Sequence, residues 1–356
     1  MKKPDGVRDQ REVGGASKPC RPHTALRACA FLLLALPTAA AAADAPAAEH
    51  ASLSIPAQNL AFIDLYVAQD EGFWSKANLD VTVQSIAGIG STNAVISGSV
   101  DFAFASGPTV TRANARGQKL VALATTIAQS DEDIIVSKEA AEAAHFDMNA
   151  PLTVRGKVLK GLIIATGGTG AIPDVVLKVV AKEAGLAPDD VTTAATAPTE
   201  FIAAFQRKAI NGFVSGPPFA QIPLLDGTGV MVSDTTKGEP QAYSPVSSAL
   251  LEARADFCPA HRSICVTLVH GIALASQFVH DHPQETLAVM KRHFGVYGDK
   301  VLEASYQQLA PLMPVPPVTT PQELENADRL DIAAGFLKPS DKLPDYSAII
   351  DNEFAK

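Results

Sequence analysis

The sequence predicts an α/β protein built of two lobes, each with a mostly parallel sheet flanked by helices. From residue 51 onward, short apolar segments alternate with amphipathic segments, which is typical of parallel strands connected by helices. A strand, a glycine-containing turn and a helix follow one another in both halves of the chain. The 313 residues beyond an expected leader of 43 also exceed the usual size of a single hydrophobic core.

The leader, residues 1–43, is expected to be a secretory signal peptide. A basic stretch at 18–27 precedes the apolar run 28–43, which ends in small residues suited to cleavage near Ala43. This run of 16 residues is shorter than the roughly 20 that a membrane span needs. We therefore expect a soluble periplasmic protein, with an uncleaved anchor as the alternative.

The charge balance argues against a nucleic-acid partner. Removing the leader removes seven Lys or Arg and three Asp or Glu from totals of 29 and 38, which leaves 22 and 35 and a net charge of −13. Binding to phosphate backbones needs a positive surface. We expect a monomer that binds a small molecule.

The first lobe is expected to start with a strand at 52–55 and a helix at 61–71 that ends at Gly72. A strand at 79–86 follows, in which polar and apolar residues alternate. Further strands are expected at 100–105, 120–125 and 133–136, and further helices at 92–96 and 109–115.

The second lobe is expected to repeat this order, with strands at 162–165, 191–194, 210–214 and 227–232 and helices at 174–184 and 199–207. The predicted boundaries place residues 44–137 and 245–356 in the first lobe and 138–244 in the second. The hinges are expected near 136–137 and between 244 and 268. The apolar, β-prone segment 264–275 is expected to return the chain to the first lobe, before helices at 282–294, 300–312 and 323–334.

Ligand contacts are expected from the turns that follow the strands, because small hydroxyls and free backbone N–H groups gather at one end of a parallel sheet. For Ser91 and Thr92, helix capping is an equally good interpretation. Phe219 is preferred over Trp74 as an aromatic contact, because Trp74 follows a helix and is expected in the core. The candidate ligand-binding residues are Gln58, Asn59, Phe62, Ser91, Thr92, Ser106, Gly107, Gly168, Thr169, Gly170, Ser215, Pro217 and Phe219.

The turns are small and neutral, so an organic anion is ranked first among possible ligands, since helix N-termini can offset a negative charge. Pyrimidines and other nitrogenous solutes also fit. The acidic run at 131–133 is interpreted as a solvated loop. We expect no catalytic residue, cofactor or metal, because the turns supply neither a nucleophile and base nor a set of metal ligands.

The mature chain keeps two cysteines, Cys258 and Cys265. In an oxidising compartment they could close a small disulfide loop, with two free thiols as the alternative. Together with His261 they fall short of the four ligands that a structural zinc site needs.

Several phrases, in order, resemble the periplasmic substrate-binding proteins of ABC importers, in the NMT1/THI5-like group that binds sulfonates, taurine, nitrate and thiamine precursors. The resemblance extends from about residue 52 to residue 293. Where relatives often have a tryptophan before a proline, this chain has Gly216 before Pro217. The phrases are Gln69-Asp70-Glu71-Gly72-Phe73-Trp74 with Leu79-Asp80-Val81, Ser97-Gly98-Ser99-Val100-Asp101-Phe102-Ala103, Ala115-Arg116-Gly117, Leu159-Lys160-Gly161, and Glu183-Ala184-Gly185-Leu186 with Asp190-Val191.

The resemblance implies the two-lobed periplasmic binding protein fold of type II, with two hinge strands joining the lobes. It also implies a solute-binding role and a permease partner in the inner membrane. Two alternatives stay open: an enzyme on the same fold, similar to the pyrimidine-precursor synthases, or a sensor domain that reports its ligand to a signalling partner.

Overall fold

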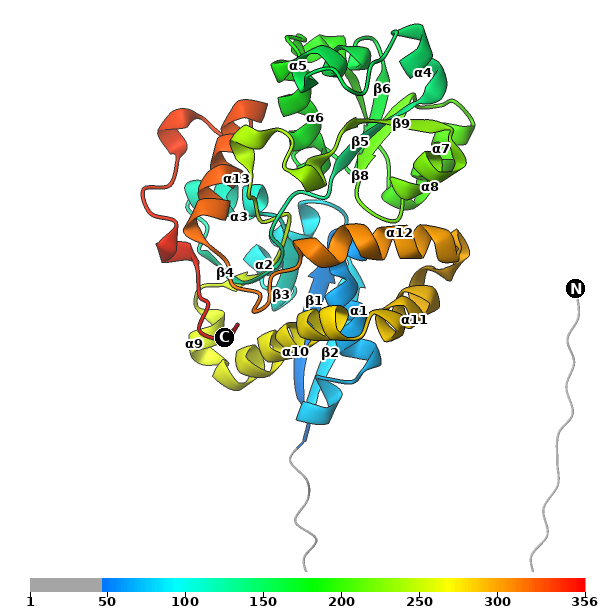
Figure 1. Ribbon diagram of the computed structural model, residues 1–356. Coiled ribbons are helices and arrows are strands. Elements are labelled where there is room, and N and C mark those ends of the chain that lie inside the picture. The colour runs from blue at the N-terminus through cyan, green and yellow to red at the C-terminus, as the bar shows by residue number, and fades with distance from the viewer. Residues whose placement is uncertain (1–46, 356) are drawn as a thin grey trace, which may run out of the picture. The chain divides into compact units, whose positions relative to one another are not determined.

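The computed structural model describes residues 47–355 (Figure 1). The predicted signal peptide lies outside the described residues. The described chain forms two five-stranded sheets, each flanked by helices, which confirms the predicted two-lobed α/β architecture. We call the lobe with the first sheet lobe 1 and the lobe with the second sheet lobe 2.

The sheet of lobe 1 has the strand order β2-β1-β3-β10-β4. Strand β1 is parallel to β2 and β3, whereas β10 is antiparallel to β3 and β4. Because the parallel strands share one direction, the turns that follow β1 and β3 meet at one edge. The strands are β1 (Glu49–Ile55), β2 (Leu79–Ser85), β3 (Phe102–Ala105), β4 (Leu120–Ile127) and β10 (Ala249–Arg254).

The sheet of lobe 2 has the corresponding order β7-β6-β8-β5-β9. Strand β6 is parallel to β7 and β8, and β5 is antiparallel to β8 and β9. One strand of reversed direction in each sheet therefore carries the chain between the lobes. The strands are β5 (Asp133–Ser137), β6 (Ile163–Thr166), β7 (Thr192–Ala195), β8 (Gly212–Ser215) and β9 (Gly229–Ser233).

The first crossing lies earlier than the predicted boundary at residue 137. Strand β4 ends at Ile127 in lobe 1, and β5 already pairs with β8 and β9 in lobe 2, so the crossing occupies residues 128–132. The apolar residues of β5 suit either sheet, and only strand pairing assigns them to lobe 2. The return crossing occupies residues 234–248, between β9 and β10.

The helices cover both faces of the sheets (Figure 1). Helix α13 contacts α3 in lobe 1 and α6 in lobe 2, and α12 contacts α11 and α8. The helices are α1 (Ile63–Asp70), α2 (Gly90–Ser97), α3 (Gly107–Ala115), α4 (Lys138–Ala143), α5 (Leu152–Arg155), α6 (Ile172–Glu183), α7 (Pro198–Gln206), α8 (Gln221–Asp226), α9 (Phe257–Ala260), α10 (Arg262–Asp281), α11 (Pro283–Phe294), α12 (Asp299–Leu309) and α13 (Pro321–Ala334).

The prediction that segment 264–275 is β-prone is wrong, because these residues lie inside the 20-residue helix α10. Its buried residues Cys265, Leu268, Val269 and Ile272 recur at helical spacing, and the helix packs against α1. Helix α10 is long and apolar enough to cross a membrane by length and composition, but its buried side belongs to the core of lobe 1. The strand that returns the chain is β10 instead.

The structure links Cys258 of α9 to Cys265 of α10 by a disulfide bond, and both cysteines are buried in the core of lobe 1. Trp74 is buried in the same core, where its Nε1 donates a hydrogen bond of 3.0 Å to the carbonyl of Leu268 in α10. These contacts hold the long helix against the first sheet.

Candidate ligand-binding pocket

A cavity of about 360 Å³ is lined by residues from both lobes. Lobe 1 contributes the turn after β1, the start of α2 and the turn from β3 into α3. Lobe 2 contributes the turns after β6 and β7 and the end of β8, and both crossings contribute as well. A cavity of this size is typical of small-molecule sites.

The turns reach the cavity because each one leaves the carboxyl end of a strand. After β1, Asn59 turns the chain into a short helix, and its Oδ1 accepts a hydrogen bond of 3.0 Å from the N–H of Ala61. After β3, Ser106 is the N-cap of α3, and its Oγ lies 2.9 Å from Thr109 Oγ1. Asn59 thus caps its helix with its side chain, whereas Ser106 contacts a neighbouring hydroxyl and makes no side-chain cap.

Six of the thirteen sequence-predicted ligand-binding residues line the cavity, and the structure brings them together from the two lobes. They are Gln58, Asn59, Phe62, Thr92, Ser106 and Ser215. The other seven are absent from the lining, and they are Ser91, Gly107, Gly168, Thr169, Gly170, Pro217 and Phe219.

Packing explains the two exceptions in lobe 1. Ser91 lies on the covered side of α2, where its Oγ is 2.7 Å from Ser54 Oγ. Gly107 lies under α13, and a Cβ at this position would be 2.9 Å from the Cβ of Ala327. Neither residue lines the cavity, so their contact with a ligand stays a prediction.

Lobe 2 shows the same effect. Phe219 is 1% exposed and packs edge to face against Phe201 and Tyr297. The carbonyl of Pro217 accepts a hydrogen bond of 3.1 Å from the N–H of Leu60 in lobe 1. These two residues therefore serve the core and the contact between lobes.

The glycine turn of lobe 2 reaches the cavity through Gly167, whereas Gly168, Thr169 and Gly170 lie outside the lining. The carbonyl of Gly170 accepts a hydrogen bond of 2.8 Å from Arg112 Nη2 in α3. The turn thus contacts lobe 1 directly at its far end.

The acidic run at 131–133 is buried, so its interpretation as a solvated loop is wrong. Asp131, Glu132 and Asp133 are 1%, 7% and 0% exposed. Asp131 and Glu132 line the cavity, together with Ser248 from the return crossing. These three residues of the crossings are among the polar lining residues that the sequence prediction missed, and the others are Ser85, Thr109, Thr196 and Thr199.

The carboxyl oxygens of the first crossing differ in whether they have a hydrogen-bond donor. Ser248 Oγ donates a hydrogen bond of 2.7 Å to Asp131 Oδ1. Asp131 Oδ2 and Glu132 Oε2 are buried and have no hydrogen-bond partner among the described residues. These two oxygens of the first crossing are therefore without a protein donor, and Asp131 Oδ2 faces Gly216.

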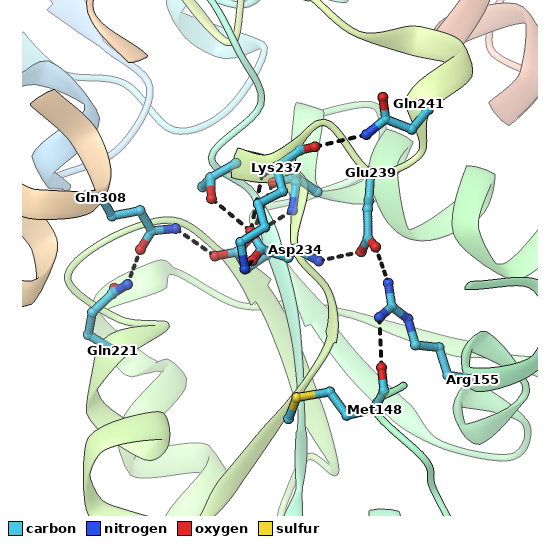
Figure 2. Close-up of polar contacts among 11 residues, drawn as sticks. Met148, Arg155, Gln221, Asp234, Lys237, Glu239, Gln241 and Gln308 are labelled. Atoms are coloured by element: carbon cyan, nitrogen blue, oxygen red, sulfur yellow. Dashed lines mark hydrogen bonds and ion pairs between the residues drawn. The ribbon is translucent and has the colours of Figure 1, made fainter. Parts of the chain in front are cut away.

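Asp133, by contrast, is held by a polar network behind the cavity. Its Oδ1 accepts hydrogen bonds of 2.9 and 3.2 Å from the N–H and Oγ1 of Thr235, and its Oδ2 accepts one of 2.7 Å from Gln308 Nε2. Gln308 lies on α12, and its Oε1 accepts a hydrogen bond from Gln221 Nε2 (Figure 2). Asp133 is thus occupied by structural contacts.

Burial raises the pKa of each carboxyl group in this run. The pKa of Glu132 lies well above its ordinary value because of burial and the neighbouring charges of Asp131 and Asp133. Burial likewise raises the pKa of Asp131, and burial together with Asp234 raises the pKa of Asp133 to about 7. Burial thus favours the protonated form of all three acids, of which Asp131 and Glu132 line the cavity.

One signal in the sequence could have identified Asp131 and Glu132. They lie directly before the apolar residues of β5 in a segment between two strands of different sheets. Such a crossing lies between the lobes, so its polar residues face the space that the lobes share. Strand pairing was needed to locate the crossing.

A family model described as NMT1/THI5 like matches residues 59–286. No curated protein matches the sequence significantly. The match covers most of the described chain, from the turn after β1 to the start of α11.

Solved structures show the same fold at low sequence identity. A protein from Bordetella bronchiseptica RB50 has a TM-score of 0.76 and 18% identity, over 86% of this chain and 95% of that one. The alkanesulfonate-binding protein SsuA from Xanthomonas axonopodis pv. citri, bound to MOPS, has a TM-score of 0.67 and 16% sequence identity. The match covers 86% of this chain and 99% of that one. The periplasmic nitrate-binding protein NrtA from Synechocystis PCC 6803 has a TM-score of 0.63 and 15% sequence identity. The match covers 87% of this chain and 88% of that one.

Proposed function

The chain belongs to the NMT1/THI5-like family, and from this membership we propose that it is the periplasmic solute-binding component of an ABC importer. It captures a small organic solute between its two lobes and delivers it, chemically unchanged, to a permease in the inner membrane. The mature protein acts as a monomer after removal of its signal peptide.

The observation that carries this proposal is the cavity lined by both lobes and both crossings. A ligand there contacts Ser106 in lobe 1 and Ser215 in lobe 2 at the same time. Only contacts that need both lobes favour the closed arrangement, so binding is coupled to a hinge motion at the crossings. A permease can then distinguish the loaded protein from the empty one.

An enzyme on the same fold is the rival function. Pyrimidine-precursor synthases on this fold are expected to need histidine and cysteine chemistry. The residues that line the cavity, all within 47–355, include neither histidine nor cysteine. The two cysteines of the described chain form the disulfide in the core of lobe 1 instead. Binding without reaction fits this lining better.

A thermal-shift screen of residues 44–356 against a metabolite panel tests the proposal. A ligand present at about 100 times its dissociation constant adds about 2.7 kcal/mol to the free energy of unfolding. Mass spectrometry of the recovered ligand then shows whether it is unchanged. Absence of any stabilising compound, or recovery of a converted product, would contradict the solute-binding role.

A further inference from the structure

The cavity carries acidic groups and no basic ones. Asp131 and Glu132 line it, and the lining residues, all within 47–355, include no Lys, Arg or His. Asp131 Oδ2 and Glu132 Oε2 have no hydrogen-bond partner among the described residues, although both side chains are more than nine-tenths buried. An unpaired buried carboxyl oxygen is costly and indicates a missing donor.

The helix N-termini at the cavity are poor anion sites, which weakens the ranking of an organic anion as first choice. Proline occupies the first turn of α3, α6 and α7, as Pro108, Pro173 and Pro198, and each removes one N–H donor. In α3, the N–H of Gly107 donates to Ser247 O at 2.8 Å, and that of Thr109 donates to Ser106 O at 3.0 Å. An anion would find few free donors there.

We propose, on the basis of the solute-binding role above, that the ligand is a small organic cation whose amine or amidine group is bound by Asp131 and Glu132. The two carboxyl groups attract its positive charge from the wall of the cavity. Phe62 lines the same cavity, and an aromatic ring attracts a cation and covers its apolar part.

Binding of a cation is coupled to proton release. The titratable groups that act on Asp131 and Glu132 are each other and Asp133, and Asp133 is in turn beside Asp234, which pairs with Lys237 at 2.7 Å. Burial among like charges raises the pKa of Glu132 and so favours its protonated form in the empty cavity. An arriving cation favours the carboxylate, so the proton leaves to the solvent.

Matched pairs of probes separate a cation site from other solute sites. The panel pairs amines or amidines with carboxylates of the same carbon skeleton, for example benzamidine with benzoate and putrescine with succinate, alongside neutral analogues. We expect only cations to raise the melting temperature. A shift with anions or neutral compounds alone would overturn the cation assignment and leave the solute-binding role intact. No shift with any compound would overturn the solute-binding role itself, and the cation assignment with it.

Calorimetry on the strongest cationic probe then tests the two carboxyl groups. The variant Asp131→Asn with Glu132→Gln resembles the neutral acids in shape and should fold. It should weaken cation binding about 10- to 100-fold. The control Glu139→Gln removes an exposed acid on α4 and should leave affinity unchanged. Unchanged affinity in the double variant would overturn the assignment.

Proton release gives a readout that a purely structural role would not produce. Calorimetry in two buffers with different ionisation enthalpies counts the protons released with each bound cation. We expect a release of up to one proton in the wild type and none in the double variant. Equal heats in both buffers for the wild type, at a pH where Glu132 is protonated, would contradict ionisation of these acids.

Discussion

Asp131 Oδ2 lies 2.4 Å from the position that a Cβ on Gly216 would occupy. The carbonyl oxygen of Asp131 is 2.9 Å from the same position. Glycine therefore lets the turn after β8 approach the first crossing closely. A larger residue at 216 could not coexist with the buried carboxyl group.

Replacing Gly216 by alanine should therefore destabilise the protein. Overpacking at a tight contact typically costs about 1 to 3 kcal/mol in the free energy of unfolding. Denaturant titration measures this loss. The matched control is Gly167→Ala, because nothing lies within 4 Å of a Cβ there. Equal stability of Gly216→Ala and the wild type would show that the crossing adjusts without cost.

Buried acids should make the empty protein less stable as pH rises. Burial raises the pKa of Asp64 and Asp133 to about 7 and that of Glu252 to about 8. The unfolded chain releases these protons near pH 4, whereas the folded chain keeps them until pH 7 to 8. The folded state thus binds more protons in this window, and the free energy of unfolding falls across it.

Glu252→Gln tests the pH dependence directly. The variant has no carboxyl group to titrate at position 252. Its free energy of unfolding should therefore fall less steeply between about pH 5 and pH 8 than that of the wild type, by up to about 1.4 kcal/mol per pH unit. Glu139→Gln is the control, because a hydrogen bond from Lys208 lowers the pKa of that exposed acid, outside this window. Denaturant titrations over this pH range compare the variants, and a parallel fall in Glu252→Gln and the wild type would contradict the prediction.

Ser91 and Thr92 should separate stability from binding. Ser91→Ala removes a buried hydrogen bond to Ser54 and should lower the free energy of unfolding by about 1 to 2 kcal/mol, without changing ligand affinity. Thr92→Val keeps the shape of the side chain at the cavity but removes its hydroxyl, and should weaken ligand binding about 5- to 10-fold.

Calorimetry with a stabilising compound and thermal melts of the empty variants measure the two effects. The reverse pattern, in which Ser91→Ala weakens binding and Thr92→Val does not, would mean that α2 turns its other side toward the ligand.

Arg112 should stabilise both the packing of α13 on α3 and the contact with lobe 2. It lies in α3, pairs with Asp331 of α13 at 2.8 Å and donates to the carbonyl of Gly170 in lobe 2. Both side chains of the pair are at most 8% exposed. Arg112→Met leaves Asp331 buried without its partner, which typically costs about 3 to 5 kcal/mol.

A double-mutant cycle with Asp331→Leu measures this pair. The double variant Arg112→Met with Asp331→Leu should recover most of the lost stability, because apolar residues of similar size often replace a buried pair at little cost. Additive losses in the two single variants would instead show that Arg112 acts mainly through the Gly170 carbonyl.

The sequence by itself determined the fold class, the order of most strands and helices, and the turns where ligand-contacting groups should gather. These follow from local periodicity and from glycine and capping residues, which act within a few positions along the chain. Hence Ser106 and Ser215, at strand ends of different lobes, were correctly placed at one cavity.

Only the tertiary structure decided which way each side chain points and where the chain crosses between sheets. Ser91 and Thr92 are adjacent, yet one faces the core and the other the cavity. Asp131 and Glu132 look solvated in the sequence, but strand pairing places β5 in lobe 2 and buries both acids between the lobes. Burial depends on contacts with residues far away in the chain. The sequence alone therefore could not show that acidic residues line the pocket.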